Sequence, residues 1–335
     1  MTTPSGQISA QDIKNEFGEV GGTVPLGSYR VSQTKGELTL AIGDGVPTSG
    51  TISYDNMRNK RLNIVVDYYS GGTITRQDQG DGALSARHVY YNDNSKVSVI
   101  GGLKSKPNDT SPHRIRIHVN KQIGGKKGEQ TVCALRTGDF NSGTSLIVDV
   151  GGEGAIYGGG GDGGQGGDVD SSGHAGENGA SALGIEYNGT TVNVASGGLI
   201  RCGFGGGGGG GAGRQNDKGS ERTVGGGGGG GGQGYPGGAG GSEGNADHGQ
   251  SAGSAGDISE AGEGGGGGNN GNQAYSGAGG EGGSQGEAAD AGAGANHGSG
   301  AGGAEGSAIR KASGVSFSLN NNGTVTGNTN QTGVS

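Results

Sequence analysis

The chain has 335 residues, a net charge of −8 and 89 glycines, of which 65 fall between residues 151 and 306. Residues 58–127 carry 13 basic and 5 acidic side chains, whereas residues 151–306 carry 4 basic and 17 acidic ones. This split indicates two modules with different neighbours, and the basic residues are too evenly mixed with strand-forming residues to predict a nucleic-acid surface. The two isolated cysteines argue against a disulfide framework or a zinc site. Neither a signal peptide nor a membrane-spanning helix is predicted, so we expect synthesis in a cytoplasm.

Residues 1–60 contain two similar helix starts. Ser9 is a favourable N-cap for the first, and GTIS at residues 50–53 repeats GQIS at residues 6–9. Each predicted helix is about two turns long, which is too short for stability in isolation. We predict that the segment docks either on its own chain or on a partner protein. The apolar residues expected to mediate this attachment are Ile8, Ile13, Phe17, Ile52 and Met57.

Residues 61–150 have the composition of β-strands, with Val, Ile, Tyr and Thr separated by Gly, Asn and Asp. The segment Arg114–Val119 alternates polar and apolar side chains, which places its apolar residues on one face of a strand. We predict a compact sandwich or layered β domain that supplies most of the conventional core. The expected strands are Arg61–Tyr69, Leu84–Tyr91, Lys96–Ile100, Arg114–Asn120, Thr131–Arg136 and Ser145–Val150.

The glycine block cannot have an ordinary hydrophobic core. Burial of its few large apolar side chains, at about 1.5–3 kcal/mol each, does not offset about 1–2 kcal/mol of backbone entropy per ordered residue. The block is therefore either a flexible linker or ordered by hydrogen bonds between backbones. Strand-like residues at 182–202 and beyond 308 favour order, because a disordered tail would not need foldable β segments on both sides of it. The large apolar residues between 203 and 306 are Phe204, Val224, Tyr235, Ile258 and Tyr275.

Several ordered structures are rich in glycine. Six prolines and the lack of a strict G-X-Y period exclude collagen, and the single GGQGGD match at residues 163–168 does not make a calcium-binding β-roll. A helix of the polyproline II type has three residues per turn and no internal hydrogen bonds, so glycine helices of this kind could bond to one another at close approach. We predict such a polyglycine-II bundle, with Gly203–Gly213 and Val224–Gly234 as antiparallel neighbours and a turn at Tyr235–Pro236.

Alternation of these runs places the polar segments 168–178, 214–222, 245–249, 269–275 and 290–297 at one tip. A rigid stalk that presents loops is typical of a recognition scaffold. The alternative is that these residues are solvated turns without a partner. The candidate receptor-binding residues are Asp168, His174, Arg214, Gln215, Asn216, Asp217, Lys218, Glu221, Arg222, Asn245, Asp247, His248, Asn269, Asn270, Asn272, Tyr275, Asn296 and His297.

Both ends and the middle of the chain resemble proteins of tailed bacteriophages. GQISAQDIKNEFG and GVPTSGTIS near the start, and SGVSFSLNNNGTVTG near the end, are similar to tail-protein segments. SALGIEYNGTTVNVASGGLIRCGFGGGGGGG at residues 181–211 resembles the T-even-type distal tail-fibre adhesins. That resemblance implies a polyglycine-II sandwich whose tip loops bind outer-membrane proteins. The implied glycine motifs are Gly158–Gly167, Gly203–Gly213, Gly225–Gly234, Gly237–Gly244, Gly262–Gly268 and Gly277–Gly283.

We therefore expect a mostly β N-terminal part with short helices, followed by a polyglycine-II bundle with loops at one tip. The expected domains are a virion-attachment segment at 1–60, which would use the apolar residues named above, a β-rich attachment or shaft domain at 61–150, a receptor-binding domain at 151–306, and a C-terminal β segment at 307–335 that packs back on the attachment side.

The expected function is that of a receptor-binding adhesin at the tip of a phage tail fibre or tail. Its N-terminal region would bind a tail-fibre or tail-tip protein, and its loops a bacterial outer-membrane protein in preference to lipopolysaccharide. We expect no enzyme activity, cofactor, metal ion or nucleic-acid partner. The main alternative is a structural tail-tip or assembly protein without receptor contact; an ice-binding protein and an enzyme are further alternatives.

Overall fold

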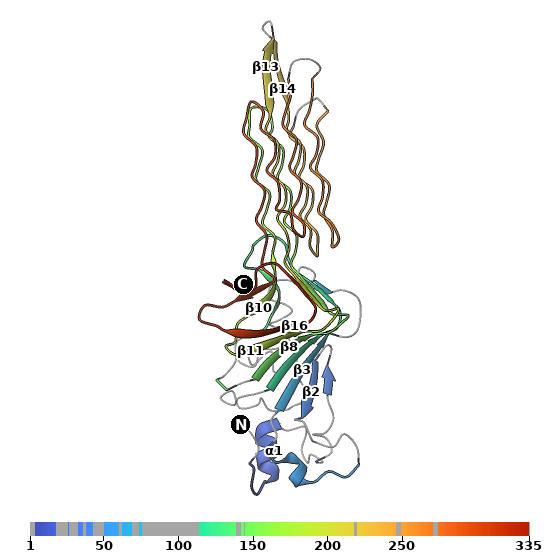
Figure 1. The fold of residues 1–335 in the computed structure, drawn as a ribbon, viewed down its shortest axis with the longest axis vertical. Coiled ribbons are helices and arrows are strands. Elements are labelled where there is room, and N and C mark those ends of the chain that lie inside the picture. The colour runs from blue at the N-terminus through green and yellow to red at the C-terminus, as the bar shows by residue number, and fades with distance from the viewer. Residues whose placement is uncertain are drawn as a thin grey trace.

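The computed structural model describes residues 4–17, 26, 33–35, 38–42, 50–59, 62–68, 74–75, 114–138, 142–143, 145–217, 220–245, 249–270 and 274–334. This part of the chain is elongated, with helix α1 (Ala10–Phe17) at one end, β-sheets in the middle and extended glycine segments at the other end (Figure 1). The predicted strands Leu84–Tyr91 and Lys96–Ile100 lie outside the described residues.

Matching caps hold two short helical elements near the N-terminus. The Ser9 amide donates to Oδ2 of Asp12 at 2.8 Å, and the Asp12 amide donates to Oγ of Ser9 at 3.2 Å. The same reciprocal capping box joins Ser53 and Asn56 at the start of the second element, η2 (Tyr54–Met57). The repeated sequence therefore produces a repeated cap, as a Ser residue with a polar partner three residues later predicts.

The second element is shorter than the sequence predicts. η2 is a single 3₁₀ turn of four residues, because the backbone of Arg58 is already extended, with φ −69° and ψ 141°. Ile13 and Met57 are both buried, so the two elements are fixed by packing. Short helices gain most of their stability in this way.

The middle of the molecule contains three sheets whose strands recur in the same chain order. Consecutive strands of different sheets form one coil, and coils stack in parallel, which makes a β-solenoid. The first sheet consists of β1 (Gln33–Lys35), β2 (Leu38–Ile42), β3 (Leu62–Tyr68), β5 (Arg114–Val119), β8 (Ser145–Val150), β11 (Thr190–Val194) and β16 (Phe317–Asn321), in that order. Its first two pairings, β1 with β2 and β2 with β3, are antiparallel, and the following ones are parallel.

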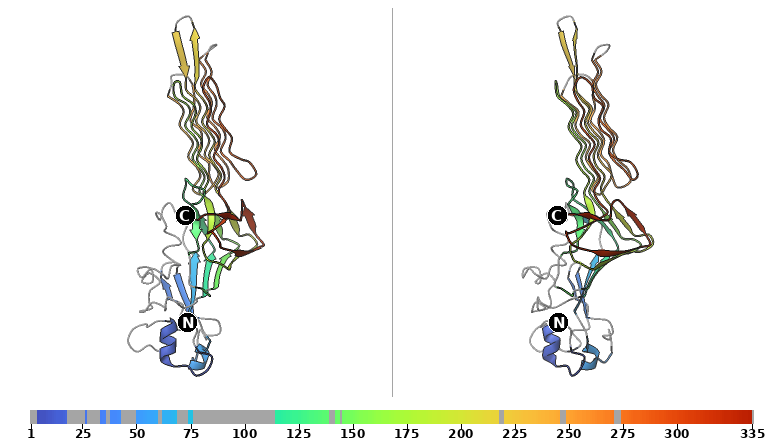
Figure 2. Two further views of the ribbon diagram at one scale, coloured as in Figure 1. Left: turned by 90° about the vertical axis from the view of Figure 1, so that its left-hand side faces the viewer. Right: turned by 60° about the vertical axis from the view of Figure 1, so that its left-hand side comes forward.

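The other two sheets complete each coil. The second contains β4 (Ile74–Thr75), β6 (Gln122–Gly124), β9 (Ala155–Tyr157), β12 (Leu199–Arg201) and β17 (Thr324–Thr326). The third contains β7 (Cys133–Arg136), β10 (Ser181–Ile185), β15 (Ile309–Lys311) and β18 (Gln331–Thr332). The last coil projects to the side below the glycine segments (Figure 2).

Register between coils stacks like residues on like residues. Inside the first sheet, Ile117 pairs with Val148, and Val148 with Val192. All three side chains are fully buried. On the outer face of the same sheet, the Asn193 amide donates to Asp149 at 2.6 Å, and the Asn320 amide donates to Asn193 at 2.8 Å. When coils stack, the alternating pattern therefore places apolar side chains in columns inside the solenoid and polar side chains in hydrogen-bonded rows outside it.

This arrangement corrects the predicted sandwich. The sequence correctly identified Arg114–Asn120 and Ser145–Val150 as strands, and the structure is mostly β, but neighbouring strands are parallel and come from successive coils. A local alternation of apolar residues is the same in a sandwich and in a solenoid. Only the pairing partner, which lies a full coil away in the sequence, distinguishes the two.

The glycine segments are insertions into two coils. One leaves β9 and returns at β10, and the other leaves β12 and returns at β15. Strand β11, which lies between the two insertions in sequence, pairs with both β8 and β16. The solenoid thus continues on both sides of the glycine segments. The longer insertion also contains the hairpin of β13 (Gly213–Asp217) and β14 (Ser220–Val224).

Backbone hydrogen bonds between the glycine segments recur every third residue. Gly160, Gly163 and Gly166 donate to the carbonyls of residues 236, 239 and 242 at 2.8–2.9 Å. Gly207 and Gly210 donate to residues 230 and 227, both at 2.8 Å. The predicted antiparallel contact between residues 203–213 and 224–234 is therefore confirmed.

The two longest glycine runs lie in the interior of the bundle. Residues 203–213 form backbone hydrogen bonds with six other segments, namely 158–168, 171–180, 225–234, 276–283, 289–294 and 298–306. A Cβ added to Gly206, Gly207 or Gly208 would lie 2.0–2.1 Å from a carbonyl oxygen, in each case of a different neighbouring segment. No side chain fits on any face of an interior segment, which explains the uninterrupted glycine.

Candidate functional site

The glycine segments end in turns that gather at the distal tip, the end of the bundle farthest from the N-terminal helix (Figure 1). The β13–β14 hairpin projects there as a continuation of the two interior segments. The turns around its base are residues 168–171, 245–249, 269–275 and 295–297, of which 246–248 and 271–273 lie outside the description. Turns that are spread between positions 168 and 297 of the sequence thus lie at one surface.

Asp170 connects three of these segments. Its carboxylate lies 3.4 Å from Nη1 of Arg214 at both oxygens and 3.5 Å from Nε2 of His297. The amide of Arg214 donates to Oδ1 of Asn296 at 2.6 Å. The first turn, the hairpin and the last turn are therefore tied together by side chains.

Two further contacts attach the remaining turns. The amide of Asn245 donates to Oδ1 of Asp168 at 2.7 Å. Arg222 lies on β14, the hairpin strand that does not contain Arg214. Its Nη1 donates to Oδ1 of Asn270 at 3.3 Å. Each described turn of the distal tip is thus linked by a side chain to another turn or to the hairpin.

The structure brings most predicted site residues to the distal tip, with one correction. His174 lies on the flank of the bundle, because residues 173–180 form an extended segment whose amides at 173, 176 and 179 bond to residues 298, 301 and 304. A segment at the edge needs glycine only every third residue, so this one does not look like a glycine run. Residues 289–294 are likewise an extended segment, whose amides at 290, 292 and 293 bond to residues 281, 300 and 278, which leaves only 295–297 as the last turn.

Some predicted residues are less fully described. The side chains of Gln215, Asn216, Asp217 and Glu221 are not described, although their backbones lie in β13 and β14. The residues that lie outside the described parts of the chain are Lys218, Asp247, His248 and Asn272.

Sequence reasoning missed Val169 at the distal tip. Its side chain is 45% exposed, and that of Tyr275 is 57% exposed. In the described residues, the remaining large apolar side chain with comparable exposure is Tyr54, at the opposite end of the molecule. The signal in the sequence was an apolar residue between two aspartates in a turn.

At the N-terminal end, the predicted attachment residues pack within the chain itself, which is the first of the two alternatives that the sequence left open. Ile13 and Met57 are buried, and Ile8 and Ile52 are partly buried against the core, so these residues hold the end together. The side chain of Phe17 lies outside the described residues. Tyr54, in the first position of η2, is a large apolar residue that faces solvent, with 44% exposure.

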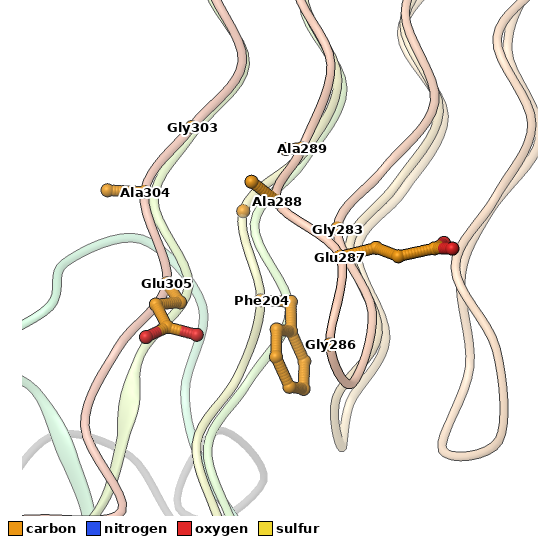
Figure 3. Close-up of a pocket in the computed structure, with 10 residues that line it drawn as sticks. Phe204, Gly283, Gly286, Glu287, Ala288, Ala289, Gly303, Ala304 and Glu305 are labelled. Carbon is orange, nitrogen blue, oxygen red and sulfur yellow. The ribbon is translucent and has the colours of Figure 1, made fainter. Parts of the chain in front are cut away.

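A groove of about 520 Å³ lies at the base of the bundle, beside the ring of Phe204. Figure 3 shows that the carboxylates of Glu287 and Glu305 point away from each other and away from the ring. A ligand site normally has polar groups that converge on its occupant. This groove therefore does not compete with the distal tip as the functional site.

Other kinds of site find no support in the described residues. In that part of the chain no group of three or more His, Cys, Asp or Glu side chains could hold a metal ion. No described helix has the length and apolar character to cross a membrane. Neither cysteine forms a disulfide and both are buried, and burial raises the pKa of Cys202 to about 12.

Comparison with known families decides the class of the protein. The family model of the phage tail fibre adhesin Gp38 matches residues 86–330. The chain belongs to this family. The adhesin is therefore a protein of the phage virion, located at the tail fibre.

A solved structure, the gp37–gp38 adhesin tip complex of the bacteriophage S16 long tail fibre, is similar at 16% identity with a TM-score of 0.37. The match covers 85% of the adhesin and 90% of that chain. No curated protein sequence matches the adhesin.

Proposed function

We propose that the adhesin is a receptor-binding protein whose two ends have different partners. The distal tip binds an outer-membrane protein of the bacterial host, and the N-terminal end binds a tail-fibre protein. The observation that carries the proposal is the position of the exposed apolar residues. The turns that contain Val169 and Tyr275 lie at one end of the elongated molecule, and η2, which contains Tyr54, lies at the other. Binding, without catalysis, is the proposed activity.

The glycine segments are proposed to be polyglycine-II helices that act as a rigid spacer. Support comes from the hydrogen bonds that recur every third residue and go to neighbouring segments. Support also comes from the interior run at residues 205–211, where every Cβ would clash with a backbone carbonyl. Three residues per turn without internal bonds defines this geometry. A scaffold of this kind tolerates changes at its turns, because most of the lateral bonds join the extended segments.

The proposed contact surface of the distal tip combines aromatic and polar groups. Tyr275 is exposed and pairs with Asn269 across its turn, and the hairpin base carries Arg214 and Arg222. Tyrosine and arginine contribute disproportionately to binding at protein interfaces. A protein partner fits this mixture better than the phosphate-rich part of lipopolysaccharide, since residues 151–306 as a whole are strongly acidic.

Two matched tyrosine variants test the proposal. Tyr275→Ser should weaken binding of the purified adhesin to host cells by about tenfold, the effect of losing one important aromatic contact, and leave its incorporation into virions unchanged. Tyr54→Ser should have the opposite pattern. Binding is measured with labelled protein on host cells, and incorporation by immunoblot of purified phage.

A larger replacement tests the distal tip as a whole. Exchanging residues 214–223 for a short Gly-Ser turn should abolish binding to host cells while the protein remains folded. If this replacement and Tyr275→Ser both bind like the unmodified adhesin, the distal tip does not recognise the receptor, and the structural role in the tail is the better explanation.

A further inference from the structure

Asp170 combines an unusual backbone with several side-chain contacts. Its φ is 59°, a conformation that residues with a Cβ adopt rarely. Two other turns of the bundle place glycine in the same region, at Gly249 with φ 71° and Gly286 with φ 91°. Glycine would therefore satisfy the backbone at position 170 at least as well. What aspartate adds there is its carboxylate.

The carboxylate closes a ring of three segments. It contacts the guanidinium of Arg214 and the imidazole of His297, which belong to the hairpin base and to the last turn. Two main-chain hydrogen bonds complete the ring. The amide of His297 donates to the carbonyl of Ala212, and the amide of Ala212 donates to the carbonyl of Ser171. Without the carboxylate, the hairpin side chain Arg214 loses its ion pair to the first turn.

The hairpin depends on this support for its orientation. In the described residues, β13 and β14 pair with each other over five positions, and the structure gives no third strand beside them. A two-stranded hairpin is marginally stable by itself. Its direction is therefore set at its base, where Asp170 braces one strand through Arg214 and Asn270 braces the other through Arg222.

We propose that Asp170 is a positioning residue that fixes the β13–β14 hairpin relative to the neighbouring turns, so that the distal tip is a preformed surface. The inference rests on the proposed receptor-binding function and specifies how that surface is held. Preorganisation raises affinity because less conformational freedom is lost on binding.

The decisive variant is Asp170→Gly, which removes the carboxylate and can adopt the positive φ at position 170 without strain. The unfolding midpoint should be unchanged or higher, while NMR order parameters of the β13 and β14 amides should fall. Binding to host cells should weaken about two- to fivefold, the range that one exposed ion pair supplies. Asp170→Asn keeps an oxygen acceptor for Arg214 and should recover part of the loss.

Glu281→Gln is the matched control, because it removes the same charge from an exposed position on the flank of the bundle. It should change neither the order parameters nor binding. The proposal is wrong if Asp170→Gly leaves hairpin order and binding unchanged while the 214–223 replacement abolishes binding. It is also wrong if Asp170→Gly lowers the unfolding midpoint in parallel with binding. If neither Asp170→Gly nor the loop replacement affects binding, the proposed function itself fails.

Discussion

The β-solenoid and the glycine bundle both pack closely, but one uses large apolar side chains and the other has none in its interior. Both satisfy backbone amides through neighbouring strands or segments that are distant in sequence. The solenoid encloses apolar side chains such as Ile117, Leu135 and Ile156. The bundle excludes side chains altogether from its interior. The comparison shows that close packing, which hydrophobic side chains normally provide, can be reached by backbone alone when Cβ atoms are absent.

The largest expected effect is a cavity in the solenoid. Leu135 is fully buried and stacks on Leu183 of the next coil. Leu135→Ala should lower the free energy of unfolding by about 2–5 kcal/mol, as for other buried leucines. Urea unfolding followed by circular dichroism measures this loss. A loss well below about 1 kcal/mol would mean that the core does not carry the stability of the solenoid.

In the bundle, the opposite change should be harmful. A Cβ at Gly229 would lie 2.1 Å from the carbonyl oxygen of Gly207. Gly229→Ala should therefore lower the free energy of unfolding by about 1–3 kcal/mol, the usual range for overpacking. The same urea titration provides the measurement.

Gly266 offers the control for that substitution. Its Cβ would meet nothing closer than Oγ of Ser251, at 3.6 Å. Gly266→Ala should leave stability unchanged or raise it slightly, by reducing the entropy of the unfolded chain. Equal losses from the two alanine substitutions would contradict the tight interior packing of residues 225–232.

A smaller effect should arise at Cys202, where the solenoid meets the bundle. Burial, followed by the charge of Glu305, raises its pKa from 9.0 to about 12. The folded protein thus favours the neutral thiol. The resulting stability is fully present below pH 9 and is lost as the pH rises toward 12. Between pH 8 and 10 the loss for this group should be about 1.4 kcal/mol.

Other groups also titrate in that range, so the difference between the unmodified protein and Cys202→Ala is the informative quantity. Thermal unfolding at about pH 8, 9 and 10 should show that the variant loses stability less steeply with rising pH. Parallel curves for the two proteins would mean that the thiol is accessible to water at the junction.

Sequence patterns located the elements that depend on local interactions. The serine caps at residues 9 and 53 follow from short-range hydrogen bonding. The alternation in Arg114–Val119 correctly predicted a strand, and alternating glycine runs correctly placed several turns at one end. Edge segments such as 173–180 were missed because glycine at every third residue is a weaker pattern than a continuous run.

The composition of the chain determined that the block at 203–306 could be ordered only through its backbone, because it lacks the apolar side chains for a core. Which segments become interior, with six neighbouring segments around residues 203–213, was decided by tertiary packing. The same is true of the solenoid and of the contacts of Asp170 with Arg214 and His297, which join residues 44 or more positions apart. Local sequence patterns do not predict such pairings, because the pairings form only when distant parts of the backbone come into register.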